Sequence, residues 1–461
     1  MRKALALLLA AALLVTPALA VQEEPAATLE AQPLSPWAYD ALADIYALGM
    51  WSDDYDYCIL DPVTEEQLEL ICGAVAEKLA LLSIAPNEDD SEPLVIDNTR
   101  RGVKNALYQE IAAYDMPYVD SKSVYDTLGE LGVVLGDGTG NDIDSRVCTL
   151  QEALVMASRL VLSLYDCYNA GSLGLLWKAV NGGNTLYLLG TIHVDRSNVY
   201  PLHRQLRTIL TEADAVLFEV DLNDAEGMTA LMLMQMYRDG SLLSDHIAPA
   251  LYGKVVQALA PLGLSEQQVA VYKPWALANT FQALAMMDES TGETFMAVDS
   301  YVNAKAANVG VTIGAVESYE FQGGIFDSLS DAYQEEYLSG TLELYLGADA
   351  ENQTDSGDLD DLDAWMEAWK TRDITAFAAS YDKDAYLTGD DELACKLFTE
   401  RDPHMIAAAA EILAGDTRKP SSADPHKTIV MVVGAGHMIG ETGIVQGLID
   451  LGYAVEEVKL P

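Results

Sequence analysis

The first part of the chain follows a plan of two helices joined by an acidic loop. Apolar residues recur at helical spacing over 37–49, and an acidic loop over 52–62 follows. Thr64 with Gln67 predicts a capping box that opens a second helix over 65–82. Because the pattern closes one helix before it opens the next, it predicts a compact helical hairpin.

The plan returns further along the chain. A helix is predicted over 125–132, a glycine- and aspartate-rich loop over 137–142, and a second helix, again opened by a threonine, over 149–164. Residues 98–119 between the two copies are a candidate for a degenerate third copy. The arrangement resembles an S-layer homology repeat, which implies attachment to a cell-wall polymer. The alternative is a helical domain with a structural role only. In both cases we expect a small α-helical, S-layer-homology-like domain over 35–170.

After this helical region the pattern changes to short apolar runs typical of buried strands. A hairpin over 177–193 turns at Asn181-Gly182, and the run 215–222 carries Glu219 within apolar neighbours. Further strands are predicted over 295–299, 309–316 and 452–460, helices over 202–211, 225–239, 248–262, 265–287, 328–346, 365–369, 393–399 and 405–413, and an exposed loop over 347–363. Strands that alternate with helices predict an α/β domain over 175–461.

Two of the apolar runs end in the same short motif. The run 186–189 leads into Gly190-Thr191-Ile192-His193, and the run 429–433 leads into Gly434-Ala435-Gly436-His437. Ligands bind beyond the carboxyl ends of strands in open α/β sheets, and a glycine lets backbone or ligand approach closely. The two strands therefore predict one site that receives two imidazoles. The alternative is that each histidine only caps the sheet.

These motifs resemble the TraB/GumN family, which includes the TIKI metalloproteases. The resemblance rests on Gly190 to His193 with 199–202, and on 433–437 with the glycines of 440–443. It extends to Tyr272-Lys273-Pro274-Trp275 and to an Arg-Asn…Met signature. In this chain Asp402 stands at the position of the asparagine. It implies an α/β fold with a mixed sheet flanked by helices, also EreA/ChaN-like, and a metal-dependent hydrolase, specifically a peptidase. The alternative is a non-catalytic surface protein that sequesters a peptide or another ligand.

A catalytic metal centre needs a few nitrogen or oxygen ligands and a nearby base. His193 and His437 are the candidate nitrogen ligands for a divalent cation such as Mn, Co or Zn, and Glu219 is a candidate ligand or general base. Arg401 is a candidate stabiliser of a developing oxyanion. Simple alternatives are a satisfied carboxylate for Glu219 and a salt bridge for Arg401. The motif glycines are Gly190 and Gly434, and supporting residues are Asp221, Asp299, Glu317 and Gln322. His404 and His426 are expected at the surface.

Charge limits the classes of partner. The chain has 461 residues, of which 26 are basic and 72 acidic, so its formal net charge is −46. Such a surface repels nucleic acid and anionic lipid, although solubility alone is an equally good reason for acidity. We expect a peptide or protein substrate and a cell-wall polymer as partners, and no nucleic acid.

The amino terminus predicts export. Arg2 and Lys3 precede an apolar segment over 4–15, and Ala18-Leu19-Ala20 is a cleavage signal, so residues 1–20 read as a signal peptide and 21–34 as a flexible leader. The apolar segment is too short to span a membrane. We therefore expect a secreted, extracellular protein without a transmembrane segment. The chain has five cysteines, and their odd count predicts an unpaired thiol or an intermolecular bridge. Cys72 and Cys167 lie in apolar helical patterns and are expected in the core.

Overall fold

The computed structural model describes residues 31–86, 94–115, 123–135, 143–192, 199–286, 296–348, 357–387, 391–415 and 427–459. Several features expected from the sequence lie outside these ranges. They are the signal peptide, the leader up to residue 30, the acidic loop over 137–142, His193 and His426.

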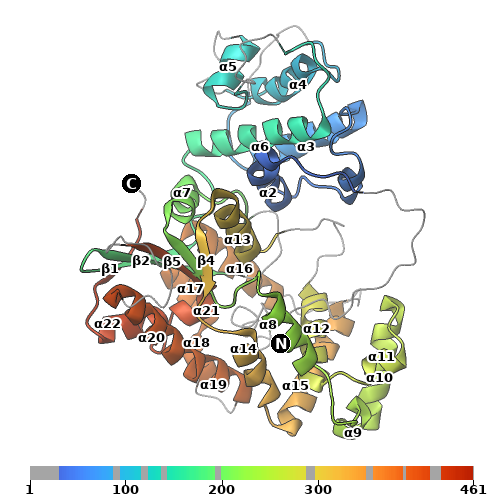
Figure 1. Ribbon diagram of the computed structural model, residues 1–461, viewed down its shortest axis with the longest axis vertical. Helices are drawn as coiled ribbons and strands as arrows, with labels where there is room; N and C mark the ends of the chain where they lie inside the picture. Colours follow the sequence, from blue (N-terminus) through green and yellow to red (C-terminus); the bar gives the residue numbers. More distant parts are fainter. Residues whose placement is uncertain are drawn as a thin grey trace.

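The helical region contains the predicted pairs of helices. Its elements are η2 (Pro36–Ala38), α2 (Tyr39–Ala47), η3 (Asp53–Tyr57), α3 (Glu65–Ala80), α4 (Arg100–Ala112), α5 (Val124–Glu130) and α6 (Leu150–Cys167). Thr64 and Thr149 each form a capping box, and Thr99 caps α4 within the predicted third copy. Figure 1 shows these helices as a blue-to-green body above the sheet, with α6 at its centre packed on α2, α3 and α4.

Short bridges tie the starts of three of these helices together. Pro62 pairs with Thr149 and Thr99 pairs with Val147, so the threonine-capped ends of α3, α4 and α6 lie side by side. Cys72 is buried, as predicted, but the prediction for Cys167 is wrong because this residue is exposed at the last position of α6. The apolar stripe of the helix has ended before that position.

The α/β region is built on a mixed sheet whose six described strands follow the order β4-β3-β5-β2-β1-β6. The strands are β1 (Leu175–Asn181), β2 (Asn184–Thr191), β3 (Ala215–Phe218), β4 (Thr312–Ala315), β5 (Thr428–Gly434) and β6 (Val455–Glu457). The four strands β2 to β5 run parallel, whereas β1 pairs antiparallel with β2 and with β6. Strand β5, at the centre, is buried over Ile429–Gly434, as expected for a sheet covered on both faces.

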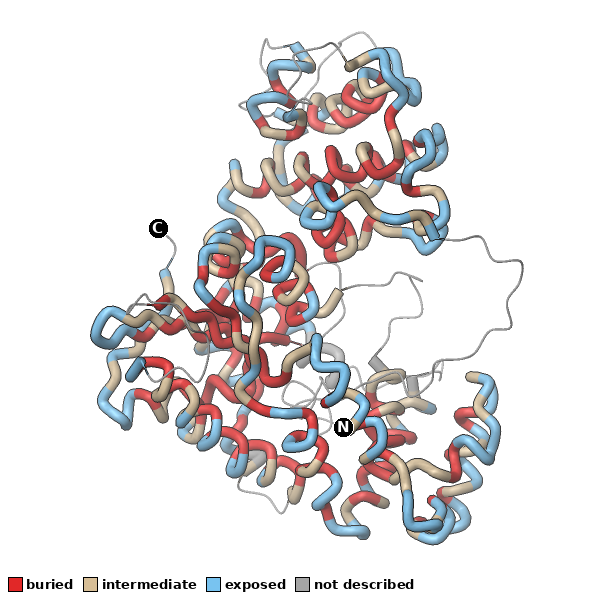
Figure 2. The backbone as a smooth tube through the Cα atoms, in the orientation of Figure 1, coloured by how far each residue is buried: buried red, intermediate tan, exposed pale blue. Residues whose placement is uncertain are grey.

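Helices cover both faces of this sheet, which confirms the predicted fold class. In Figure 1 the helices α7 and α13 lie above the sheet, and α20 and α22 lie below it. Figure 2 shows the buried residues concentrated along α6 and around the sheet. The helices of this region are α7 (Arg204–Glu212), α8 (Ala225–Met234), α9 (Leu243–His246), α10 (Pro249–Leu259), η5 (Ala260–Leu262), α11 (Glu266–Val269), α12 (Pro274–Met286), α13 (Val298–Val309), α14 (Tyr319–Asp327), α15 (Asp331–Ala348), α16 (Gly357–Thr371), α17 (Ile374–Tyr381), α18 (Lys383–Leu387), α19 (Glu392–Thr399), α20 (Arg401–Ala414), α21 (Ala435–Met438) and α22 (Ile444–Asp450). Among the described helices, none combines the length and apolar composition that a membrane-spanning segment requires.

Three secondary-structure predictions are wrong. The single helix expected over 265–287 is two helices, α11 and α12, because the chain is not helical over 270–273, just before Pro274. The run 295–299 was expected to be a strand, but Val298 and Asp299 begin helix α13, whose buried residues Val298, Tyr301, Val302 and Lys305 follow helical spacing. A short apolar run cannot by itself distinguish a strand from the start of a buried helix. The acidic run 347–363 was expected to be a loop, yet α16 already begins at Gly357. The prediction overlooked that acidic side chains are favourable in the first turn of a helix.

The helical region contacts the α/β region through a buried ion pair. Tyr301 donates to Asp44 Oδ1 at 2.8 Å, and Lys305 Nζ donates to Asp44 Oδ2 at 3.1 Å. Burial raises the pKa of Asp44, an effect that the charge of Lys305 opposes. Helix α2 of the first region is therefore joined to α13, the helix that also carries Asp299.

Candidate functional site

The two strands that carry the Gly-x-x-His motifs are neighbours. Strand β2 pairs parallel with β5, with Gly190 opposite Val433 and Thr191 opposite Gly434. Parallel strands lie about 4.8 Å apart, so the segments after them leave the same edge of the sheet side by side. Of the two histidines, His437 lies in the short helix α21 and is fully buried, and His193 is outside the described residues.

The motif glycine Gly190 stands where the two segments approach most closely. A Cβ atom at this position would lie 3.1 Å from Cα of Ala435, a tight contact that the neighbouring backbone would have to relieve by shifting. Its carbonyl accepts a hydrogen bond from the indole of Trp369 at 2.7 Å. Gly434 has another role, because its N–H donates to Glu219 Oε1 at 2.8 Å. Gly190 therefore allows the close approach of the two segments, and the backbone of Gly434 ties the end of β5 to Glu219.

Four predicted residues form one buried group, which we call the arginine cluster: Glu219, Glu317, Gln322 and Arg401. Arg401 Nη2 donates to Glu219 Oε2 at 2.5 Å and to Glu317 Oε2 at 2.8 Å. Gln322 Nε2 bridges the same two carboxylate oxygens at 3.0 and 2.9 Å. Glu219 follows β3 and Glu317 follows β4, and Arg401 opens α20, so three elements meet beyond the carboxyl ends of the strands.

The charges of this cluster are strongly coupled. Burial on its own lowers the pKa of Arg401, but the charges of Glu219 and Glu317 and their hydrogen bonds outweigh it and raise that pKa above its ordinary value. Arg401 is 1% exposed, so its guanidinium is enclosed by the two carboxylates rather than open to a ligand. The geometry matches the simple alternative of a salt bridge, here a buried one.

A second buried group, the histidine cluster, consists of Lys383, Asp402, His437 and Thr442. His437 Nδ1 lies 2.7 Å from Asp402 Oδ1. Lys383 Nζ donates to Asp402 Oδ2 at 2.6 Å, and the hydroxyl of Thr442 donates to the same oxygen at 3.2 Å. Asp402, which stands where the family resemblance led us to expect asparagine, is the centre of this group.

The remaining predicted residues lie at the same edge of the sheet but in neither cluster. Thr191 donates to Asp299 Oδ1 at 3.2 Å, so Asp299 sits directly beside the end of β2. Asp221 instead accepts from the N–H of Asn223 at 2.9 Å and shapes the turn after β3. The structure thus brings Asp299 to the Gly-x-x-His edge and leaves Asp221 in a local turn.

The sequence prediction missed Lys383 and Thr442. Thr442 lies in a stretch of the family resemblance but was given no role, and α18, which carries Lys383, was not predicted as a helix. The only signal for Thr442 was its place in the glycine-flanked segment 440–443, and for Lys383 there was none. A lysine is almost never fully buried without a partner, but burial is not visible in the sequence.

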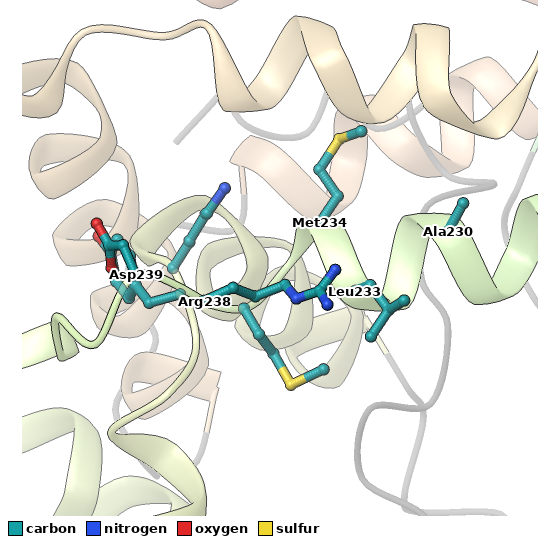
Figure 3. Close-up of a pocket in the computed structure, with 8 residues that line it drawn as sticks. Ala230, Leu233, Met234, Arg238 and Asp239 are labelled. Carbon is teal, nitrogen blue, oxygen red and sulfur yellow. The ribbon is translucent and has the colours of Figure 1, made fainter.

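Two surface cavities lie near these clusters without including their residues. One, of about 540 Å³, is lined by α8 and the segment after it and is shown in Figure 3, with Met234 and Arg238 among its residues, Asp239 at one end and Ala230 at the other. The other, of about 750 Å³, runs between β4 and α20 and includes Asp221, Gly314 and His404. Both offer space for a ligand on the side of the α/β region that carries the clusters.

The family model described as TraB/PrgY/gumN family matches residues 175–457 of this chain. The chain belongs to the TraB/PrgY/gumN family. The matched range covers the sheet, both clusters and both Gly-x-x-His motifs, and it confirms the fold class. It begins after the helical region, so the S-layer resemblance of that region stays a prediction.

Among curated proteins, this TraB/PrgY/gumN chain is similar to two that are named metalloproteases. Metalloprotease TIKI1 of Danio rerio is 23% identical over 305 residues, which cover 59% of this chain and 60% of that protein. The metalloprotease TIKI homolog of Nematostella vectensis is 22% identical over 312 residues, which cover 59% of this chain and 64% of that protein. The chain therefore spans under two thirds of the length of either relative. No solved structure gives a significant match.

Proposed function

We propose that the chain is a hydrolase that uses a divalent cation to cleave peptides. The observation that carries the proposal is the parallel pairing of β2 with β5, because it sets Thr191 and Gly434, the ends of the two motif strands, side by side. The names of the two TIKI relatives support a metal cofactor and a protein substrate. The acidic surface of the chain agrees with a preference for cations and for peptides over nucleic acid.

The chemistry of His437 fits the role of a cation ligand. A metal-binding imidazole almost always has its other nitrogen held by a carboxylate, a carbonyl or water, and Asp402 holds Nδ1 of His437. We therefore assign Nε2 of His437 to the cation and His193 as the second imidazole. A bound divalent cation would supply an acidic water and polarise a substrate carbonyl. Within the described ranges no three His, Cys, Asp or Glu side chains form a ready cation site, and His193 lies outside those ranges.

Glu219 fits a different role from that of a ligand. Its Oε1 accepts from Gly434 and its Oε2 accepts from Arg401 and Gln322, so both oxygens are occupied. The guanidinium of Arg401 would also repel a cation at that carboxylate. We infer that Glu219 anchors Arg401 and the end of β5, and we keep the roles of base and ligand as outcomes of the test.

The test is metal content and peptide hydrolysis of the purified chain. We expect His193→Ala and His437→Ala each to lose the bound divalent cation and all hydrolysis, because few ligands remain. His404→Ala is the matched control, since His404 is exposed and belongs to neither cluster. Glu219→Gln separates the possible roles of Glu219. If Glu219 is a ligand, the variant loses the cation. If Glu219 is a general base, the variant keeps the cation and its turnover falls by roughly 10²–10⁴-fold.

Two results would contradict the proposal. Wild-type protein without any divalent cation, or histidine variants that bind cation as well as wild type does, would exclude a shared centre. Cation-loaded protein that binds peptides from a library without cleaving them would favour the alternative of a sequestering surface protein.

We also propose export and attachment to the cell wall. The charged start, short apolar segment and Ala18-Leu19-Ala20 of the sequence support export, and the three packed threonine-capped helices support an S-layer-like repeat. Mass spectrometry of the mature chain tests export, because an intact Met1 in cells would refute it. Sedimentation of the full chain with purified walls tests attachment, and chain that stays in the supernatant would refute it.

A further inference from the structure

Helix α8 carries an exposed apolar face to which the proposed cation centre gives no role. Four of the 15 methionines of the chain lie within residues 228–236: Met228, Met232, Met234 and Met236. Within α8, which the structure describes throughout, only Gly227 and Leu231 are buried, and Met232 and Leu233 are 41% and 40% exposed. Methionine side chains are flexible and polarisable, and they are over-used at surfaces that bind apolar partners of varied shape. The composition and exposure of this face therefore indicate an apolar partner.

The pocket of Figure 3 lies at the end of this face and has a wall fixed by backbone hydrogen bonds. Tyr237 N–H donates to the carbonyl of Val271, and Lys273 N–H donates to the carbonyl of Gln235, both at 2.8 Å. Residues 272–275 of this wall are part of the family resemblance and have no role in the proposed centre. The cavity of about 540 Å³ is of the size of ligand pockets, so it can receive side chains of a peptide.

The charged residues of the pocket differ in their partners. Lys273 Nζ pairs with Asp327 Oδ1 at 2.6 Å. Asp239 Oδ1 accepts from the backbone N–H of Ser241 at 3.0 Å and from its hydroxyl at 2.6 Å. Arg238, by contrast, is exposed and forms no hydrogen bond or ion pair with any residue that the structure describes. Its guanidinium is therefore the charge of this pocket that a ligand can pair with.

Carboxylates around the pocket limit the ligand to a single negative charge. Burial raises the pKa of Tyr237 most, and four carboxylates add to this effect: Asp331, Asp327, Asp239 and Asp245. Such a field repels a peptide with several acidic residues. In Figure 3 the side chain of Arg238 points along the pocket, away from Asp239 and toward Leu233. One carboxylate that lies among apolar side chains can therefore reach the guanidinium without approaching Asp239.

We propose that this pocket, which we name the methionine pocket, binds an apolar segment of a peptide substrate that carries one acidic side chain. Its thioethers and Leu233 receive the apolar side chains, and Arg238 receives the carboxylate, with which a guanidinium forms two parallel hydrogen bonds. The pocket adjoins α14, the helix that carries Gln322, because a Cβ at Gly323 would lie 2.8 Å from Sδ of Met234. The inference rests on the proposed function in one respect only, that the bound peptide is a substrate.

The experiment measures the binding of three fluorescent peptides to the full chain by anisotropy. The peptides are leucine-rich, blocked at both ends and identical except at one central position, which is glutamate, glutamine or lysine. EDTA is present, so that hydrolysis does not remove the probe. We expect the glutamate peptide to bind roughly 3- to 10-fold more tightly than the glutamine peptide, and the lysine peptide to bind most weakly. The formal charge of −46 on its own would favour the lysine peptide, so the field of the whole protein cannot produce this order.

Two variants separate the charged part of the site from the apolar part. Arg238→Gln should bind the glutamate and glutamine peptides equally and keep its affinity for the glutamine peptide. Leu233→Ser should weaken the binding of all three peptides by roughly 3- to 10-fold, because it removes apolar surface, and it should keep the preference for glutamate. Arg204→Gln is the matched control, because Arg204 is also an exposed arginine but lies on α7, and it should bind as wild type does. Thermal unfolding confirms that each variant is folded, as expected for exposed positions.

Three results would overturn the inference. They are a wild type without preference for the glutamate peptide over the glutamine peptide, an Arg238→Gln variant that retains this preference, and a Leu233→Ser variant that binds all three peptides as wild type does.

Failure of the proposed function gives a different pattern. If the methionine pocket shows the expected preference but the chain hydrolyses no peptide, the pocket stands as the site of a sequestering protein. If the chain hydrolyses peptides from a library but binding lacks the preference, the proposed function stands and the methionine pocket is not its substrate site.

Discussion

Replacing Arg401 by methionine tests whether this residue is an anchor or an open oxyanion stabiliser. In the structure the guanidinium makes contacts of 2.5 to 3.2 Å with two carboxylates, Glu219 and Glu317. Their side chains are 2% and 0% exposed. Arg401→Met leaves both negative charges buried. Of the donors described above, Gln322 and the backbone N–H of Gly434 then remain.

The expected cost is large. Breaking one buried ion pair by removing a partner typically costs about 3–5 kcal/mol, because the other charge remains uncompensated. Here two carboxylates lose the same cation, so we expect at least that loss in the free energy of unfolding at pH 7. The deficit should shrink towards pH 5, because protonation then neutralises the stranded carboxylates. Arg401→Lys keeps the charge without the planar fork and should fall between wild type and methionine.

The assay is urea unfolding followed by tryptophan fluorescence at pH 7 and pH 5. Arg238→Met is the control, because Arg238 is an exposed arginine at a surface cavity and should change stability by no more than about 0.5 kcal/mol. The triple variant with Glu219→Gln and Glu317→Gln removes every charge from the cluster, so no charge is left buried without a partner, and it should recover most of the loss. An Arg401→Met protein as stable as Arg238→Met, but slow in catalysis, would refute the anchor and support the oxyanion role.

Three further predictions concern other parts of the chain. Gly190→Ala should lower the free energy of unfolding by about 1–3 kcal/mol, because its Cβ would press on the backbone of the neighbouring segment. Gly253→Ala is the control and should be neutral or stabilising, because a Cβ there meets nothing within 4 Å. Equal effects of the two changes on thermal unfolding would contradict the close approach. Lys305→Met should cost about 3–5 kcal/mol by urea unfolding, because Asp44 is left buried without a cation, and an unchanged midpoint would contradict the buried interface. Burial first, and then the charge of Arg372, lower the pKa of His203, which favours the neutral ring in the folded chain. Stability should therefore fall as the pH drops from about 6.5 towards that lower pKa, and His203→Asn should flatten this part of the profile.

The boundary between the helical region and the α/β region was also predicted from the sequence, and the structure shows which contacts cross it. Residues 175–461 were predicted to form one α/β domain, and the family match begins at Leu175. However, removal of the helical region would leave Tyr301 and Lys305 without Asp44. We therefore expect the isolated α/β region to fold with reduced stability, and an insoluble fragment would count against the predicted boundary.

The sequence by itself determined the local structure and the positions of the two Gly-x-x-His motifs. Helix starts at Thr64 and Thr149 were predictable because a capping box is formed by residues three apart. The hairpin at Asn181 and the strands before both Gly-x-x-His motifs were predictable because apolar periodicity and turn residues act over a few positions. The same local information failed at Val298, where a short apolar run fits a strand and a helix equally well.

Only the tertiary structure decided how these pieces combine. The neighbourhood of β2 and β5 depends on the order of strands in the sheet, which no local pattern encodes. Arg401 and Glu219 are 182 residues apart, and their contact turns a candidate oxyanion stabiliser and a candidate ligand into one buried ion pair. Lys383 pairs with Asp402 only because the fold brings α18 to the start of α20, where Asp402 also contacts His437. Local propensities act within a few residues, whereas burial and charge pairing depend on which distant segments the fold brings into contact.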